Sequence, residues 1–190
     1  MPLPSICIIA FDSYGALRDG SSGHIGGAER QTSLTAQWFA QQGYPVTMIT
    51  WDEGQPDGEV HQGVRNLKIC HRESGLPALR FFVPRLTSFF AALTRANADI
   101  YYHNSAEYHT GLIAAWTRPR KKIFVYSVAN DVAVDRNLRT MRRAYERALY
   151  RYGLRQATRI IVQTEHQRGL LREGFGRDSL PLPMPCPGPA

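Results

Sequence analysis

The sequence predicts an α/β fold in which a mostly parallel sheet is covered by helices on both faces. Residues 5–11 form a short apolar run rich in β-branched side chains, which is typical of a strand buried on both faces. A helical pattern follows over residues 28–42, and a second apolar run at residues 46–51 predicts the next strand. Strand, loop, helix and strand make a βαβ unit, and the same alternation continues along the chain.

The predicted elements have recognisable ends. Gly43 stands where the first helix should stop in a left-handed turn, and Tyr44 and Pro45 cannot continue that helix. Thr164 and Gln167 have the spacing of a capping box, which marks the start of a helix running to about residue 173. The other predicted strands cover residues 64–70, 99–103, 122–127 and 159–163, and the other helices cover residues 77–96 with a break at Pro84, 107–116 and 136–155.

Polar and glycine residues gather at or just beyond the carboxyl ends of these strands. In a parallel sheet these ends meet at one edge, where ligands bind, so we expect a site there. Gly26 and Gly27 open the first helix, where exposed N–H groups favour an anion such as a phosphate. Each residue also has a structural explanation of its own, such as a cap, a turn or a tight helix entry. The set comprises Gly26, Gly27, His103, Asn104, Ser127, Asn130, Asp131, Gln163 and Thr164.

Composition indicates a globular protein that is not a membrane protein. Its 190 residues are 43% hydrophobic and 21% charged, enough to bury a proper core, and no apolar run approaches the ~20 residues of a membrane helix. The first residues carry no positively charged region of the kind that opens a secretory signal. Cys7, Cys70 and Cys186 lack the spacing of metal ligands and fit reduced thiols, so we expect a cytoplasmic protein.

The net charge of +7 comes from twenty arginines and three lysines against sixteen acidic residues. Many arginines lie in the predicted helix over residues 136–155, where Arg139, Arg143, Arg147 and Arg151 face away from the apolar line. This face is either an ordinary solvated surface or a contact for an acidic ligand or an anionic membrane, which would place the protein peripherally on the inner face of a membrane. No nucleic-acid-binding motif accompanies the charge, so we do not expect a nucleic-acid partner.

Several ordered blocks resemble the N-terminal, acceptor-side domain of the GT-B glycosyltransferases of family 4. The run Gly26-Gly27-Ala28-Glu29 and, further on, Gly43-Tyr44-Pro45-Val46 are similar to the opening of that family, although Tyr44 stands where His is usual. Residues 123–131 resemble its second acceptor-side strand and loop. Residues 160–185 resemble its last strand, helix and strand, with Met184 in place of the usual Asn.

This resemblance implies a Rossmann-like domain over residues 1–180, one half of a GT-B fold. A proline-rich linker over residues 181–190 would then lead towards an absent donor-binding domain. Such enzymes transfer a sugar from a nucleotide-sugar donor to a hydroxyl of a glycan or lipid acceptor without an obligatory metal, so we expect no metal and no cofactor. Because most donor contacts lie in the second domain, the isolated chain should be inactive.

The resemblance also implies roles for residues. Gly26 and Gly27 would face the donor diphosphate. The acceptor side would be lined by Asn104, Ser127, Asn130, Asp131 and Thr164. The family often places a His beyond the strand at residues 99–103, and both His103 and His109 are candidates for this catalytic position.

Two other functions remain open at this point. An NAD-dependent Rossmann oxidoreductase would use Asp52, after the second strand, to bind a ribose. Against this, the loop between Phe11 and Ala28 is much longer than a tight dinucleotide turn, and its glycines do not fit G-x-G-x-x-G. The third possibility is a non-catalytic, basic α/β binding module.

Overall fold

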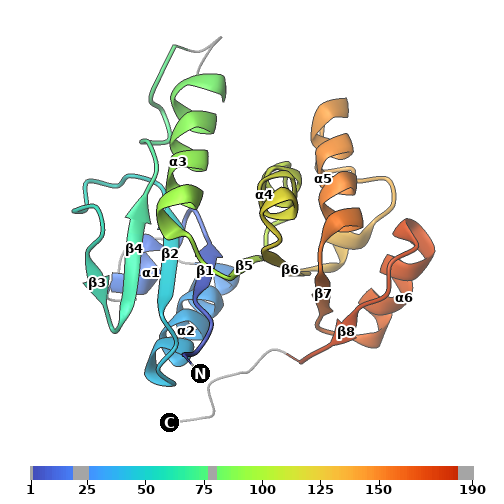
Figure 1. Cartoon of the computed structure of the whole chain (residues 1–190). Helices are drawn as coiled ribbons and strands as arrows, with labels where there is room; N and C mark the ends of the chain where they lie inside the picture. Colours follow the sequence, from blue (N-terminus) through green and yellow to red (C-terminus); the bar gives the residue numbers. More distant parts are fainter. Residues whose placement is uncertain (1, 19–25, 77–80, 184–190) are drawn as a thin grey trace. The chain divides into compact units, whose positions relative to one another are not determined.

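The computed structural model describes residues 2–18, 26–76 and 81–183, which divide into two compact units between Tyr102 and His103 (Figure 1). Most of the predicted linker, at residues 184–190, lies outside the described residues, together with Cys186 and the first four residues of the helix predicted at 77–96.

The first unit is built around a mostly parallel sheet with the strand order β3-β4-β2-β1-β5. Strand β1 pairs in parallel with β2, and β2 pairs in parallel with β4, whereas the two-residue strand β3 pairs with β4 in the antiparallel direction. The strands are β1 (Ile6–Ile9), β2 (Val46–Thr50), β3 (Val60–His61), β4 (Val64–Lys68) and β5 (Ile100–His103); the helices are α1 (Tyr14–Arg18), α2 (Gly27–Gln41) and α3 (Thr87–Ala96).

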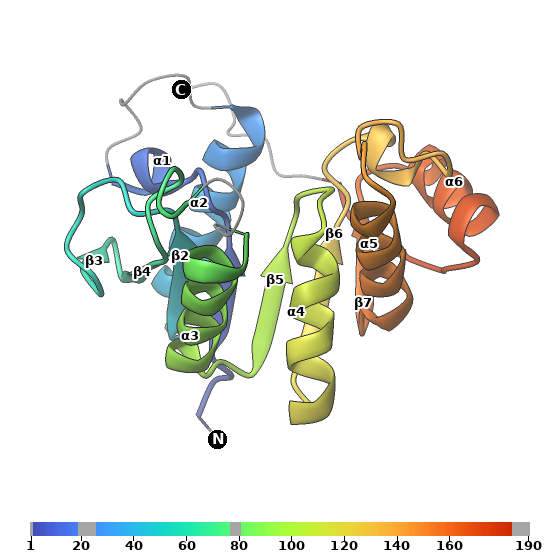
Figure 2. The same ribbon diagram turned by 90° about the horizontal axis from the view of Figure 1, so that it is seen from above.

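Helices α2 and α3 cover opposite faces of this sheet, as Figure 2 shows. All four residues of β1 are buried, as the apolar run predicts for a central parallel strand. Helix α2 ends as predicted: Gly43 follows it with a φ of +86°. The thiol of Cys7 lies fully inside the sheet, and this burial raises its pKa far above the usual range for cysteine. The thiols of Cys7 and Cys70 are free, and no disulfide joins them.

The break predicted at Pro84 is present. Val83 has extended backbone (φ −131°, ψ 120°) within the irregular turn Phe81–Leu86, and the regular helix α3 begins only at Thr87. Strand β3 is not predicted by the sequence pattern, because only two of its residues pair with β4 and a period cannot be recognised over so short a run.

The second unit contains three parallel strands in the order β6-β7-β8. Helix α4 packs against β6 and α5, and α6 packs against β7 and β8. The strands are β6 (Ile123–Ser127), β7 (Arg159–Val162) and β8 (Leu180–Pro181); the helices are α4 (His109–Thr117), α5 (Ala144–Gln156), α6 (Glu165–Phe175) and the short 3₁₀ helices Arg118–Arg120 and Asp131–Val134.

Two glycines allow α4 and α5 to cross in close contact. A Cβ on Gly153 would lie 2.6 Å from the backbone carbonyl carbon of Thr110, and a Cβ on Gly111 would collide with the backbone of Leu149. The hydroxyl groups of Tyr126 in β6 and Tyr150 in α5 are 2.7 Å apart in the buried core, and Tyr150 also donates to the carbonyl of Ala133. The position of the α4–α5 pair is therefore fixed by backbone contact and a buried polar chain.

The prediction of a long arginine-rich helix over residues 136–155 is wrong for its first eight residues. Helix α5 begins at Ala144, and residues 135–143 form an irregular loop in which Leu138 has a φ of +48°. The backbone N–H of Asn137 bonds to the Asp135 carboxylate, a local turn that competes with helix formation. Leu138 and Met141 are buried from this loop, so the apolar spacing that predicted a helix arises from two loop anchors.

Candidate functional site

Strand β1 occupies the position in the first unit where ligands of α/β sheets bind. The chain proceeds from β1 to β2 on one side and later returns to β5 on the other side, where the N–H of Ile100 bonds to the carbonyl of Ser5 just before β1. The strand order therefore reverses at β1, and the carboxyl end of this strand is a topological switch point. Gly26 and Gly27 stand at the N-terminus of α2, the helix that follows this end.

The backbone of the glycine pair is extended at Gly26 (φ −68°, ψ 160°) and enters the helix at Gly27, with no side chain capping the first N–H groups. Among the described residues, no atom lies within 4 Å of a Cβ built on Gly27, so this part of the fold leaves space beside it. A Cβ on Gly26 would collide with the Glu29 carboxylate, which folds back over the helix start. The absence of an N-cap side chain at Gly26 favours an anion at this helix N-terminus, whereas the Glu29 carboxylate over the helix start opposes one.

A second group of side chains at the strand ends of the first unit is not predicted by the sequence. Trp51, just beyond β2, has the guanidinium groups of Arg72 and Arg85 each 5.8 Å from its ring centroid. Arg72 pairs with Asp12, which follows β1, and Arg85 donates to the carbonyl of Arg72. Arg72 lies four residues past the end of β4, so searching only the residues adjacent to strand ends misses it.

Asp52, the acid on which an NAD-dependent oxidoreductase would depend, is engaged within its own turn. Its Oδ1 accepts a 2.9 Å hydrogen bond from Gly54 N, and its Oδ2 lies 3.1 Å from Lys68 Nζ. These two contacts, the hydrogen bond from Gly54 first, lower the pKa of Asp52. They leave this carboxylate a structural role in the turn after β2.

In the second unit, His103 and His109 share one carboxylate. Glu107 Oε2 lies 3.0 Å from His109 Nδ1, and Glu107 Oε1 lies 3.6 Å from His103 Nε2. The side chain of His103 is fully buried and that of His109 is 8% exposed, whereas Glu107 is 32% exposed. The ring of His109 also stacks on Tyr108 at a centroid distance of 4.0 Å. The sequence treats the two histidines as competing candidates, but the structure couples them through Glu107, which the sequence did not single out.

The other polar residues at the strand ends of the second unit form hydrogen bonds within the fold. Asn130 Oδ1 accepts from Ala133 N and begins the 3₁₀ turn, and Thr164 Oγ1 caps α6 by accepting from Gln167 N. The side chain of Gln167 bonds in turn to Asp131. Asn130, Asp131 and Thr164 thus have structural roles, and Asn104 and Ser127 are almost completely buried. The acceptor-side role of all five residues stays a prediction.

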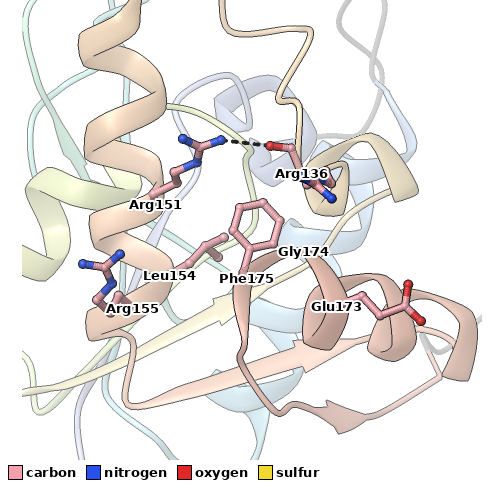
Figure 3. Close-up of a pocket in the computed structure, with 7 residues that line it drawn as sticks. All are labelled: Arg136, Arg151, Leu154, Arg155, Glu173, Gly174 and Phe175. Atoms are coloured by element: carbon pink, nitrogen blue, oxygen red, sulfur yellow. Dashed lines mark hydrogen bonds between the residues drawn. The ribbon is translucent and has the colours of Figure 1, made fainter.

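The described residues also form a pocket that none of the predicted site residues lines. It lies between α5 and α6, has a volume of about 360 Å³ and is shown in Figure 3. Within residues 2–18, 26–76 and 81–183, no group of His, Cys, Asp or Glu is arranged to hold a metal ion. None of the helices described is both long enough and apolar enough to cross a membrane.

Comparison with known families identifies the chain. Residues 26–184 match the family described as glycosyl transferase 4-like domain, and this match begins at the glycine pair before α2. The chain is a glycosyl transferase 4-like domain. The predicted resemblance is thereby confirmed. A comparison with curated protein sequences finds no match for this domain.

Solved structures support the same fold. Sucrose-phosphate synthase from Thermosynechococcus elongatus superposes with a TM-score of 0.68 at 16% identity, and the match covers 97% of this chain and 48% of that one. HepE from Anabaena, solved in complex with UDP and glucose, gives a TM-score of 0.60 at 12% identity over 92% of this chain and 42% of that one. The domain thus has the Rossmann-like α/β fold of a GT-B half, and it spans about half the length of each of these two proteins.

Proposed function

We propose that this domain is the acceptor-side half of a glycosyltransferase, which transfers a sugar from a nucleotide-sugar donor to a hydroxyl acceptor when it is joined to a donor-binding domain. The observation that carries this proposal is the family match over residues 26–184. The coverage of about half of two larger chains, one of them bound to UDP and glucose, supports the division of labour between two domains.

The uncapped start of α2 supports a role for Gly26 and Gly27 at the donor diphosphate. Leaving-group charge develops on a phosphate oxygen as the glycosidic bond to the donor breaks, and N–H groups already aimed at that oxygen would offset it. The open space at Gly27 allows a phosphate to approach the backbone. An anion at this position would also complement the positive end of the α2 dipole.

The pair of histidines that share Glu107 supports a second role, on the acceptor side. A carboxylate that contacts an imidazole through one ring nitrogen fixes the orientation of the ring. We assign this positioning role to Glu107, with His109 or His103 as the group that takes the acceptor proton. Asn104, Ser127, Asn130, Asp131 and Thr164 would shape the surface around the acceptor.

The transfer can be tested in a longer chain in which a donor-binding domain follows residue 183. We expect release of nucleoside diphosphate from a UDP-sugar or a GDP-sugar that increases when a glycan or lipid acceptor is added. The domain alone should give no such release. Robust turnover by the isolated domain, or an extended chain that is folded and never turns over any donor of the panel, would contradict the proposal.

We also propose a cytoplasmic location with peripheral attachment to an anionic membrane. Arg139 and Arg143 are exposed on the loop before α5, whose buried Leu138 and Met141 anchor the loop to the fold. Binding to vesicles that contain phosphatidylglycerol should fall steeply with salt and be lost in Arg139→Gln/Arg143→Gln. Arg159→Gln, an exposed arginine on β7, is the matched control. Equal binding to neutral and anionic vesicles would contradict the attachment.

A further inference from the structure

The pocket between α5 and α6 gathers positive charge. Arg151 and Arg155 project from the last turns of α5, and Arg136 comes from the loop before this helix (Figure 3). The Arg151 guanidinium donates a 3.0 Å hydrogen bond to the backbone carbonyl oxygen of Arg136, which ties the loop before α5 to this helix at the rim of the pocket. Three arginines therefore line one hollow of the second unit.

These charges are not neutralised by the described part of the chain. None of Arg136, Arg151 and Arg155 forms an ion pair with a described carboxylate, and Glu173, the one acidic residue in the pocket lining, forms none either. Clustered like charges repel one another, so such a rim is costly unless an anion joins it.

Two of the three arginines are not needed to stabilise the carboxyl end of α5, whereas Arg155 lies in its last turn. Another residue, Arg177, already donates to the carbonyl oxygens of Arg155 and Ala157 at the carboxyl end of this helix, at 3.2 and 2.7 Å. The partial negative charge of a helix end is felt only within the last turn, and Arg151 and Arg136 lie beyond it. The positive charge of the rim is thus available to a ligand.

The accessible lining of the pocket is mainly polar, and its two apolar side chains, Leu154 and Phe175, contribute little of it. Leu154 is 1% exposed, and Phe175 packs edge-on against Tyr150 with ring centroids 6.5 Å apart. In Figure 3 these two side chains lie between the arginines of α5 and the end of α6. The volume of about 360 Å³ falls in the range of small-molecule sites.

We propose that this α5–α6 pocket binds a small phosphate monoester. Guanidinium groups match the oxygens of a phosphate dianion, and the partly exposed ring of Phe175 would contact the organic group. The pocket-lining residues end α5 and α6 or precede α5, and none of them is among the strand-end residues assigned to sugar transfer. The proposal therefore stands independently of the proposed transferase activity.

Phenyl phosphate is the probe, and binding to the domain is followed by calorimetry. The double variant Arg136→Gln/Arg155→Gln removes two charges whose side chains form no hydrogen bond within the described residues, so the fold should be unchanged. We expect its affinity to fall about tenfold or more, because charge-assisted hydrogen bonds to the phosphate are lost. Arg142→Gln, an exposed arginine of the same loop that does not line the pocket, should change the affinity less than about twofold.

Further measurements complete the test. Inorganic phosphate should bind more weakly than phenyl phosphate, and Phe175→Leu should reduce the difference in affinity between the two ligands. Vesicles containing phosphatidic acid distinguish the sources of the ligand. Vesicle binding that is weakened in Arg136→Gln/Arg155→Gln indicates a lipid headgroup. Vesicle binding that is unchanged in this double variant, together with loss of phenyl phosphate binding, indicates a free metabolite. The proposal is overturned if phenyl phosphate shows no saturable binding at millimolar concentration, or if Arg142→Gln weakens binding as much as the double variant. Urea midpoints equal to wild type confirm that each variant is folded.

Discussion

Asp131 accepts a 3.0 Å hydrogen bond from Gln167 Nε2, and this bond ties the turn after β6 to the first turn of α6. The Oε1 atom of Gln167 accepts in addition from Gln163 N at 2.8 Å. Gln163 then donates to the carbonyl oxygens of Val128 and Ala129. Two loops at the ends of neighbouring strands are thus joined by side chains of two glutamines.

Replacing Gln167 by Ala should loosen both loops. The substitution leaves the N–H of Gln163 without its partner and releases Asp131, so we expect the free energy of unfolding to fall by about 1–3 kcal/mol. Urea denaturation followed by circular dichroism measures the change. His166→Ala, at the exposed neighbouring position, is the control and should stay within about 0.5 kcal/mol of wild type. Equal stability of the two variants would show that the glutamine bridge contributes nothing.

Two glycine substitutions, one at the α4–α5 crossing and one in α6, should have opposite effects on stability. Gly153→Ala places a Cβ 2.6 Å from the backbone of Thr110, so α4 and α5 would have to move apart. The free energy of unfolding should fall by about 1–3 kcal/mol or more. Gly169→Ala, in the middle of α6, meets no atom within 4 Å and should stabilise by about 0.5–1 kcal/mol through helix propensity. Thermal melts of both variants check this pair. A neutral Gly153→Ala would mean that the two helices can separate at low cost.

The contrast between α2 and α5 shows what the sequence can and cannot predict. Helix α2 is amphipathic and ends at a glycine that the structure finds at positive φ, so local signals alone determine it. Before α5, the spacing of Leu138 and Met141 imitates a helix, because two loop residues happen to enter the core about one turn apart. The burial of Leu138 and Met141 in the core and the local turn in which Asn137 N donates to Asp135 distinguish the two cases.

The same distinction applies to the candidate site. Strand ends can be predicted from apolar runs, so the sequence placed Ser127 and His103 correctly at the ends of β6 and β5. His103 and His109 both contact Glu107 because of how the loop before α4 folds. The sequence has no periodic pattern from which the fold of this loop could be predicted. The arginines over Trp51 come from loops distant in sequence, and their convergence follows only from the fold.

Asp52 predicts a pH dependence of stability. The hydrogen bond from Gly54, followed by Lys68, holds the folded-state pKa of Asp52 below the ordinary value of about 3.9. A lowered folded-state pKa stabilises the fold above the unfolded-state pKa, and that contribution is lost as the pH falls through the folded-state value.

Asp52→Asn should therefore be less stable than wild type near neutral pH, and the difference should shrink below pH ~4 and vanish at lower pH. Unfolding by urea at a series of pH values measures it. Lys68→Gln keeps the hydrogen bond from Gly54 and should show a smaller loss over the same range. A difference that is constant with pH would exclude the carboxylate charge as its cause.

Gly27 predicts a separation of activity from stability. Its φ is not in the left-handed region and a Cβ there meets no atom within 4 Å, so Gly27→Ala should change the free energy of unfolding by less than about 1 kcal/mol. The same Cβ would occupy the space through which a donor phosphate approaches the helix start. In a longer chain with a donor-binding domain, turnover should therefore fall about tenfold or more with an unchanged melting temperature.

Ala28→Ser, one residue further into α2, is the control and should reduce turnover less. Gly26→Ala is unsuitable, because its Cβ would also displace the Glu29 carboxylate. If Gly27→Ala unfolds the domain, the glycine serves only the backbone. If stability and turnover are both unchanged, the phosphate does not approach at Gly27.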